Sequence, residues 1–220
     1  NRLGCEVVLA KGSGCCGAIN LHLGRRAEAQ EFARINIKSW IDEFEGEGLD
    51  AVVINASGCG TVVKDYHNLF KYDPVWRRKA EKISSMSVDI TELIDEPNLP
   101  PVKFAQQFTV LYHDACSLLH GQRIVEKPRS LLRQAGFKVK EIPGKHYCCG
   151  SAGIYNLMQN DIASLLRERR LEAIKNVDSD FICTGNIGCL MQLQGGLNGS
   201  VVHTVELLDW ATGGPPPSGI

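Results

Sequence analysis

Short runs of β-branched and apolar residues alternate along the chain with longer stretches whose apolar residues recur at helical spacing. The short runs predict strands, and the longer stretches, such as Arg25–Glu45 and Leu157–Asn176, predict helices. Strands separated by helices favour parallel βαβ units, so we expect an α/β fold with mainly parallel sheets flanked by helices. The predicted strands are Glu6–Leu9, Ala51–Ile54, Thr109–Tyr112, Lys138–Ile142, Phe181–Cys183 and Val201–Val202.

One strand–helix unit occurs twice along the chain. The segment RLGCEVVLAKGSGCCGAINL aligns with QAGFKVKEIPGKHYCCGSAGIYNL, and in both a short strand and a loop lead to Cys-Cys-Gly. A long helix follows in each copy, and then a strand that leads to Gly-Cys, in LDAVVINASGC and SDFICTGNIGC. An internal repeat of this kind indicates two similar structural units. We therefore expect two cysteine-rich lobes, residues 1–95 and 106–210, related by a pseudo-twofold axis.

The Pro-rich segment Asp95–Gln107 separates the two copies and is the predicted domain boundary. Residues 211–220 are rich in Gly and Pro, and we expect them to form a disordered tail. In the first copy, a counterpart of the strand Thr109–Tyr112 would fall before Asn1. We therefore expect the chain to begin partway into its first lobe.

Charge and hydropathy exclude several function classes. The 220 residues carry 24 Lys and Arg against 25 Asp and Glu, so the chain has no basic field that would gather nucleic acid. Apolar runs such as Ala51–Ala56 are far shorter than the roughly 20 residues that a membrane-spanning helix needs. No secretory signal peptide is visible, and hydrolase and P-loop motifs are absent from the sequence.

Nine cysteines are many for a chain of this length, and their grouping indicates metal or redox chemistry. Two pairs are adjacent, Cys15-Cys16 and Cys148-Cys149, and each pair is followed by Gly. A secreted disulfide scaffold would be shorter, with spaced cysteines. Reduced thiols in a reducing compartment therefore fit this chain better.

In the second copy, four cysteines are expected to follow the ends of parallel strands. Ligands of open α/β sheets bind at that carboxyl edge, and four thiolates meeting there suit a soft metal centre. The Gly beside the cysteines lets backbone N–H groups approach sulfur, which helps to set the reduction potential of an iron–sulfur cluster. These four cysteines are Cys116, Cys148, Cys149 and Cys189.

Iron–sulfur clusters and zinc are the two candidates for this centre. Structural zinc sites usually contain short Cys-x2-Cys spans, and neither copy has one. Adjacent cysteines chelate a single ion awkwardly, whereas the several irons of a cluster offer separate anchoring points. The pattern favours an iron–sulfur cluster, with zinc as the alternative, and it disfavours a vicinal disulfide because that bond strains its peptide.

The cysteine pattern resembles that of the cysteine-rich CCG domain family, which includes a subunit of heterodisulfide reductase and an iron–sulfur subunit of anaerobic glycerol-3-phosphate dehydrogenase. The phrases CCGAINLHLGR, YHDACSLLHGQR, CCGSAGIYNLMQ and TGNIGCLMQLQGGL resemble the C-terminal part of glycolate oxidase iron–sulfur subunits. The similarity runs from about Arg2 to Trp210, which is nearly the whole chain.

The resemblance implies an electron-relay subunit of a flavin-linked dehydrogenase of glycolate or another 2-hydroxy acid. Its implied partners are a flavin-containing dehydrogenase subunit, an upstream ferredoxin-like segment with two further clusters, and quinone as the eventual acceptor. The implied location is the cytoplasm, or the inner face of the membrane through those partners. No catalytic residue is implied in this segment, and glycolate, lactate and glycerol phosphate stay open as substrates of the complex.

The chain departs from the family pattern at one position in each copy. The family motif ends in Cys-x2-Cys, but Asn186 and Ala56 stand at its first positions here. The resemblance then implies an ordinary 4Fe–4S site at Cys116, Cys148, Cys149 and Cys189. In the first copy, Cys15, Cys16 and Cys59 would be either remnants of a second cluster site or ligands for a second cluster. The alternative function is a structural zinc-binding or metal-free interaction module.

Five further residues lie near these motifs. His113 and His120 would either donate a hydrogen bond to a cluster sulfur, or shuttle a proton, or simply pack or cap a helix. Asp114 is the expected N-cap of the helix that carries Cys116. Cys5 and Cys183 fall inside predicted strands, where we expect buried thiols of the core.

Overall fold

The computed structural model of the chain describes residues 2–94, 99, 105, 107–144, 146–197 and 199–218. The chain forms two compact units, Asn1–Leu93 and Ile94–Ile220. Most of the expected boundary segment, 95–107, lies outside the described residues. Each unit has its own parallel sheet flanked by helices, which confirms the α/β class. The pseudo-twofold relation between the two lobes stays a prediction.

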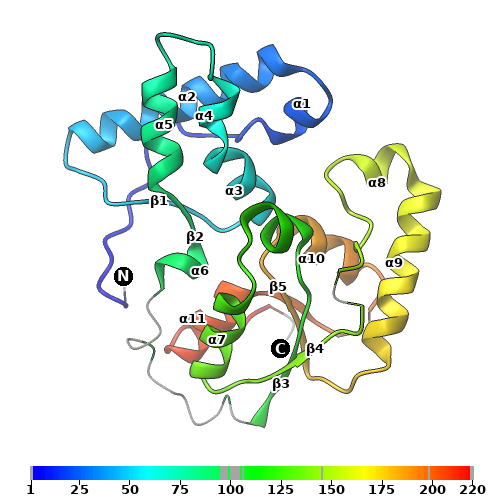
Figure 1. Cartoon of the computed structure of the whole chain (residues 1–220). Coiled ribbons are helices and arrows are strands. Elements are labelled where there is room, and N and C mark those ends of the chain that lie inside the picture. Colours follow the sequence, from blue (N-terminus) through cyan, green and yellow to red (C-terminus); the bar gives the residue numbers. More distant parts are fainter. Residues whose placement is uncertain are drawn as a thin grey trace. The chain divides into compact units, whose positions relative to one another are not determined.

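Unit 1 combines a two-stranded parallel sheet, which α3 and α6 contact, with helices that pack on one another (Figure 1). Along α2, small and apolar residues at helical spacing, such as Ala33 and Ile37, are fully buried against Val63 and Ile83 of other helices. The described elements are α1 Ala18–His22, α2 Arg26–Glu45, β1 Val52–Ile54, α3 Ser57–Lys64, α4 Tyr66–Leu69, α5 Arg77–Met86, β2 Ser87–Asp89 and α6 Ile90–Leu93.

The strands of unit 1 differ from the prediction in two places. Glu6–Leu9 is an exposed loop rather than a strand, with Leu9 91% exposed. Its counterpart in unit 2 is a strand because it pairs with Thr109–Tyr112, whereas no strand among the described residues of unit 1 pairs with Glu6–Leu9. Conversely, the sequence pattern does not predict β2, because Ser-Val-Asp carries too little apolar alternation to mark a strand.

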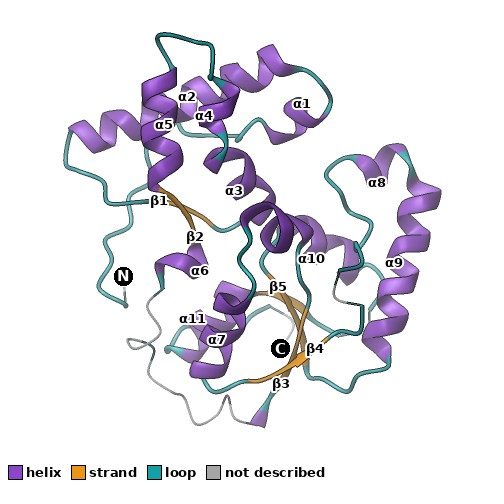
Figure 2. Ribbon diagram, in the orientation of Figure 1, coloured by secondary structure: helices purple, strands orange, loops and turns teal. Residues whose placement is uncertain are grey.

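Unit 2 contains a four-stranded parallel sheet with the order β4-β3-β5-β6. Figure 2 labels its strands β3, β4 and β5. The chain runs from β3 to β4 on one side and then crosses to β5 on the other side. The strand order therefore reverses at the β3/β5 boundary, where open sheets bind ligands at their carboxyl edge. The described elements are β3 Thr109–Tyr112, η3 Ser117–Gln122, α7 Glu126–Gln134, β4 Lys138–Glu141, α8 Tyr155–Met158, α9 Asn160–Lys175, β5 Phe181–Thr184, α10 Ile187–Gln194, β6 Val201–His203 and α11 Thr204–Ala211.

Helices cover both faces of this sheet, and aromatic rings close its amino end. α7 packs against α11, and α9 packs against α10 (Figure 1). The ring of Trp210 packs, tilted or edge-on, against three phenylalanines that stand at or just before the starts of β3, β4 and β5: Phe108, Phe137 and Phe181. The amino end of the sheet is therefore filled by apolar packing, and the carboxyl end is left for polar and sulfur-bearing residues.

The expected disordered tail, 211–220, differs in the structure. Ala211 is the last residue of α11. The backbone N–H groups of Thr212, Gly213 and Gly214 then donate to carbonyls of the last helical turn, which would otherwise lack partners. Pro217 is buried, and residues 219–220 lie outside the described residues.

Candidate metal centre

Three strand ends of unit 2 bring four cysteines to one edge of the sheet. Cys116 stands in the connection that leaves β3, directly before η3. Cys148 and Cys149 lie in the loop that leaves β4, and Cys189 lies in the first turn of α10, just after β5. β4, β3 and β5 are parallel neighbours, so these residues meet at the carboxyl edge. The structure thus places the four cysteines of the second copy together.

The four thiols interact in one continuous chain. Cys116 contacts Cys148, Cys148 contacts Cys149, and Cys149 contacts Cys189. Hydrogen bonds from Cys116 and Cys149 lower the pKa of Cys148, and the hydrogen bond from Cys149 lowers the pKa of Cys189 despite its burial. The same contacts, with burial, raise the pKa of Cys116 and of Cys149. Cys148 and Cys189 are therefore the thiols of this group that lose their protons most readily, and the thiolate is the form that binds metal.

His113 reaches the same edge from inside the core. It is fully buried, and one ring nitrogen lies within 4.8 Å of the sulfur atoms of Cys149 and Cys189. Its Nδ1 accepts a hydrogen bond from Nε of Arg170 at 3.0 Å. Its Nε2 has no hydrogen-bond partner within the described part of the chain. The sequence left a packing role and a role at the sulfurs open, and this geometry favours the role at the sulfurs.

The Gly of each Cys-Cys-Gly motif aims its backbone N–H at sulfur. In unit 2, Gly150 N donates to Cys148 Sγ at 3.3 Å, with a φ of 91° at Gly150. A Cβ built on this glycine would stand 2.3 Å from the carbonyl oxygen of Ala163 in α9. Both the left-handed backbone and the contact with α9 therefore require Gly at this position.

Unit 1 repeats this arrangement with three cysteines. Gly17 N donates to Cys15 Sγ at 3.4 Å, and φ at Gly17 is 79°. Cys16 is buried and hydrogen-bonds to the half-buried Cys59, which lowers the pKa of Cys59 to about 7. Cys15 is exposed. Among the described residues of unit 1, no fourth thiol corresponds to Cys116.

The helix behind each Cys pair contributes one buried polar side chain, and the two side chains differ. In unit 1 Asn36 accepts from Gly14 N at 2.7 Å and donates to the Cys15 carbonyl at 2.9 Å and the Tyr66 hydroxyl at 3.3 Å. In unit 2 the corresponding residue is Arg170, which donates to the carbonyls of residues 143 and 144 as well as to His113. The position that holds a neutral amide in unit 1 thus holds a cation in unit 2.

Asp114 binds an arginine instead of capping the helix that Cys116 precedes, so the capping prediction is wrong. Asp114 Oδ2 accepts from Arg129 Nη2 at 2.6 Å, and both side chains are almost fully buried. Arg129 also binds Glu141 and lies over the ring of Tyr112 at 4.5 Å. This ion pair ties the connection after β3 to α7 and to the end of β4. The sequence did not indicate it, because the three charged residues look like separate surface positions.

The residues that replace the missing family cysteines also differ between the copies. Asn186 Nδ2 donates to Cys189 Sγ at 3.5 Å, so this side chain still faces the sulfur. Ala56 precedes α3 at the corresponding place in unit 1 and has no side-chain group that could donate. At the carboxyl edge of the sheet in unit 2, Asn186 therefore acts as a hydrogen-bond donor to the Cys189 sulfur.

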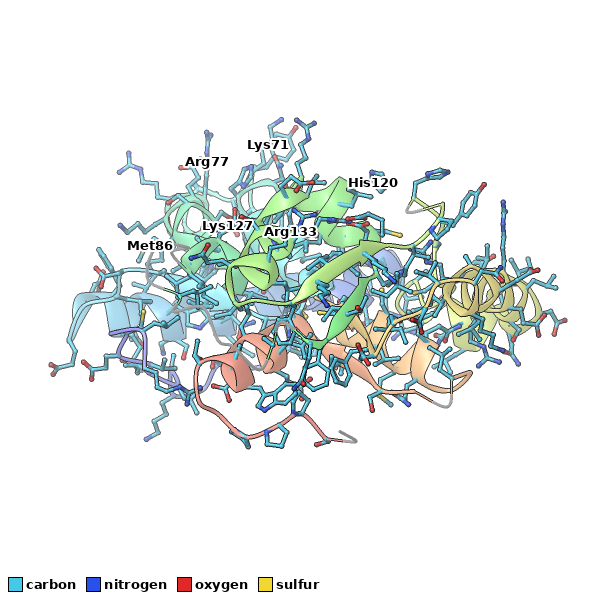
Figure 3. All side chains as sticks on the ribbon, turned by 90° about the horizontal axis from the view of Figure 1, so that it is seen from below. Lys71, Arg77, Met86, His120, Lys127 and Arg133 are labelled. Atoms are coloured by element: carbon cyan, nitrogen blue, oxygen red, sulfur yellow. The ribbon has the colours of Figure 1, made fainter. Side chains whose placement is uncertain are left out.

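The other residues that the sequence singled out lie away from the carboxyl edge of the sheet. Cys183 is fully buried in β5 and donates to Thr204 Oγ1 at 3.3 Å, which confirms the core assignment. Cys5 is exposed, so its assignment to the core is wrong: the strand expected to bury it does not form. His120 is exposed on η3, and its side chain extends outward (Figure 3).

The donor set of unit 2 fits an anionic iron–sulfur cluster. Four thiols from three strand ends meet there, and N–H donors from Gly150 and Asn186 point at two of the sulfurs. A buried cation, Arg170, and the unpartnered Nε2 of His113 lie beside them within the described part of unit 2. A mononuclear ion is the competing occupant, because His113, Cys149 and Cys189 by themselves form a compact set of three ligand atoms.

No helix among the described residues is both long enough and apolar enough to cross a bilayer.

Known proteins match the same segments. A family model described as a cysteine-rich domain, CCG, matches residues 1–64 and 110–194. The glycolate oxidase iron–sulfur subunit of Escherichia coli (strain K12) is 35% identical over 211 residues, covering 96% of this chain and 52% of that protein. The probable glycolate oxidase iron–sulfur subunit of Bacillus subtilis (strain 168) is 33% identical, covering 96% and 49%. Lactate utilization protein A of Geobacillus sp. (strain WCH70) is 27% identical, covering 94% and 88%.

These matches confirm the resemblance that the motifs carried. The chain spans about half the length of the glycolate oxidase relatives and most of the length of the lactate utilization relative.

Replacing Gly150 by Ala tests the contact behind Cys148. The new Cβ would collide with the Ala163 carbonyl, so we expect about 1–3 kcal/mol more destabilisation than a positive φ alone causes. Gly153→Ala is the matched control, because Gly153 has a φ of 68° but open space around its Cβ position. Urea unfolding measures both variants, and equal losses of stability would contradict the proposed contact.

Replacing Arg129 by Met tests the buried ion pair. The change leaves Asp114 buried without its cation, so we expect the free energy of unfolding to fall by about 3–5 kcal/mol. Arg133→Met on the same helix α7 is the control, since Arg133 is exposed (Figure 3) and its loss should stay within about 0.5 kcal/mol. Similar losses in the two variants would show that the ion pair does not stabilise unit 2.

Proposed function

Because the chain belongs to the cysteine-rich CCG domain family, we propose that unit 2 binds a 4Fe–4S cluster and relays electrons. The proposed ligands are Cys116, Cys148, Cys149 and Cys189. The observation that carries the proposal is the meeting of these four thiols at the ends of three neighbouring parallel strands. A bound cluster would supply one-electron transfer, while the protein holds it and directs N–H groups at its sulfurs.

The relatives suggest the complex in which this relay works. Two of them are named as iron–sulfur subunits of glycolate oxidase, so we propose glycolate as the substrate of the complex. We further propose a flavin-containing dehydrogenase subunit as the electron donor and quinone as the eventual acceptor. An upstream ferredoxin-like segment would carry further clusters, and this chain would contribute no residue that touches the organic substrate. Such a complex would work in the cytoplasm or at the inner membrane face.

Unit 1 provides a weaker site. As in unit 2, a glycine N–H donates to a cysteine sulfur in this group of three cysteines, but an ordinary cubane cluster takes four thiolates. We propose that Cys15, Cys16 and Cys59 hold at most a labile group in this chain.

The second candidate function is a structural zinc module, and one observation favours it. Ligand atoms of His113, Cys149 and Cys189 lie within 4.8 Å of one another, close enough to surround a single ion. Metal analysis separates the two functions: the relay requires iron, inorganic sulfide and a visible absorption that dithionite bleaches. A colourless chain that retains zinc through purification would support the structural module.

The ligand assignment predicts which cysteines the cluster needs. We expect Cys149→Ser to abolish iron binding in unit 2, because Cys149 touches both Cys148 and Cys189. Cys183→Ser is the matched control, since its equally buried thiol lies within β5 and bonds Thr204, so iron content should stay unchanged. Cys5→Ser should also retain iron. Iron loss in Cys183→Ser with full iron in Cys149→Ser would reverse the assignment.

The number of clusters is a separate prediction. After anaerobic reconstitution we expect about one stable cluster per chain, because only unit 2 offers four cysteine ligands among the described residues. Iron and sulfide quantification with Mössbauer spectroscopy measures this. Two equally stable clusters on the chain would mean that another residue completes the site of unit 1.

A further inference from the structure

Arg170 is a buried cation without a counter-ion among the described residues. Its side chain, on α9, is 1% exposed, and it donates to neutral acceptors: His113 Nδ1 and the carbonyls of residues 143 and 144. Its Nη2 has no hydrogen-bond partner within the described ranges. Arg129, by contrast, pairs with two carboxylates. A buried charge needs compensation, and the groups whose negative charge acts on Arg170 include Asp114 and the thiols Cys116, Cys149 and Cys189.

The contact with Arg170 determines where His113 carries its proton. A guanidinium Nε–H is always a donor, so His113 Nδ1 must be the acceptor of the 3.0 Å hydrogen bond. A neutral imidazole with an accepting Nδ1 carries its proton on Nε2. Within the described residues this N–H has no hydrogen-bond partner of ordinary geometry, and the sulfurs of Cys149 and Cys189 lie within 4.8 Å of a ring nitrogen of His113.

We propose that Arg170 fixes His113 as the Nε2–H tautomer, so that His113 donates to the sulfur of Cys189, and that this pair raises the reduction potential of the bound cluster. The inference rests on the proposed cluster in unit 2. Reduction adds negative charge to the cluster, and N–H donors and a nearby cation stabilise that charge. His113 is then a positioning and tuning residue beside the cluster rather than a metal ligand.

The repeat supports the electrostatic part of this proposal. In each copy the Gly of the Cys-Cys-Gly motif packs on an alanine of the following helix, Ala29 or Ala163. About two helical turns further on stand Asn36 in unit 1 and Arg170 in unit 2. Asn36 binds backbone groups and Tyr66 and carries no charge. The cation is therefore specific to the copy that has four thiols, rather than a requirement of the shared backbone.

The first test measures the reduction potential of the reconstituted full chain by a redox titration followed by EPR. We expect His113→Leu and Arg170→Gln to disfavour reduction at least tenfold, which is a shift of about 59 mV to lower potential for one electron. His113→Gln, which can still accept from Arg170 and donate to sulfur, should recover part of the shift. Lys175→Gln removes an exposed charge from the same helix and should leave the potential unchanged.

The second test reads the tautomer without any cluster. In the metal-free chain, ¹⁵N NMR of labelled histidine should show a protonated Nε2 at His113, and Arg170→Lys or Arg170→Gln should weaken that preference. A proton on Nδ1 would overturn the proposal, and so would strong nitrogen hyperfine coupling to the cluster or an unchanged potential in folded His113→Leu. A wild-type chain that takes up no iron would refute the proposed function, while the NMR result would still decide the tautomer.

Discussion

The parallel pairing of β3 between β4 and β5 is the constraint on which the site of unit 2 depends. Each of these strands ends at the same edge, and each is followed by a cysteine-bearing connection. Cys116, Cys148 and Cys189 therefore meet although they are far apart in the sequence. Aromatic packing around Trp210 occupies the opposite end of the same strands. The sheet thus separates a purely structural end from an end that can hold a ligand.

Two buried arginines near this edge serve different purposes. Arg129 is neutralised by Asp114 and Glu141, and this closed set of charges fixes the connection that carries His113 and Cys116. Arg170 is bound through neutral acceptors, so its charge acts on the thiols instead. In a poorly solvated interior such a charge keeps most of its strength. The site can therefore stabilise negative charge on its thiolates.

The two copies share a glycine whose backbone N–H donates to a cysteine sulfur, and they differ in the charge of the polar side chain behind it. Gly17 and Gly150 both adopt positive φ, pack on the following helix and donate to a cysteine sulfur. This geometry depends on the absence of a Cβ at Gly17 and Gly150. The polar residue behind it is free to vary, and it is Asn36 in one copy and Arg170 in the other. The repeat therefore provides adjacent cysteines with a backbone N–H donor twice, but a buried cation beside them once among the described residues.

The α/β class, the repeat, the strand ends that carry cysteines and the N–H groups beside them all follow from the amino-acid sequence alone. These features depend on residues that are neighbours in the chain, so they are revealed by the spacing at which apolar residues recur and by the spacing of the motifs. The pairing of Asp114 with Arg129, the contact of Arg170 with His113 and the exposure of Cys5 emerge only in the folded chain. The first two contacts join segments that the fold brings together from far apart in the sequence. The third depends on a strand at 6–9 that does not form, because strand pairing needs a neighbour that local pattern cannot supply.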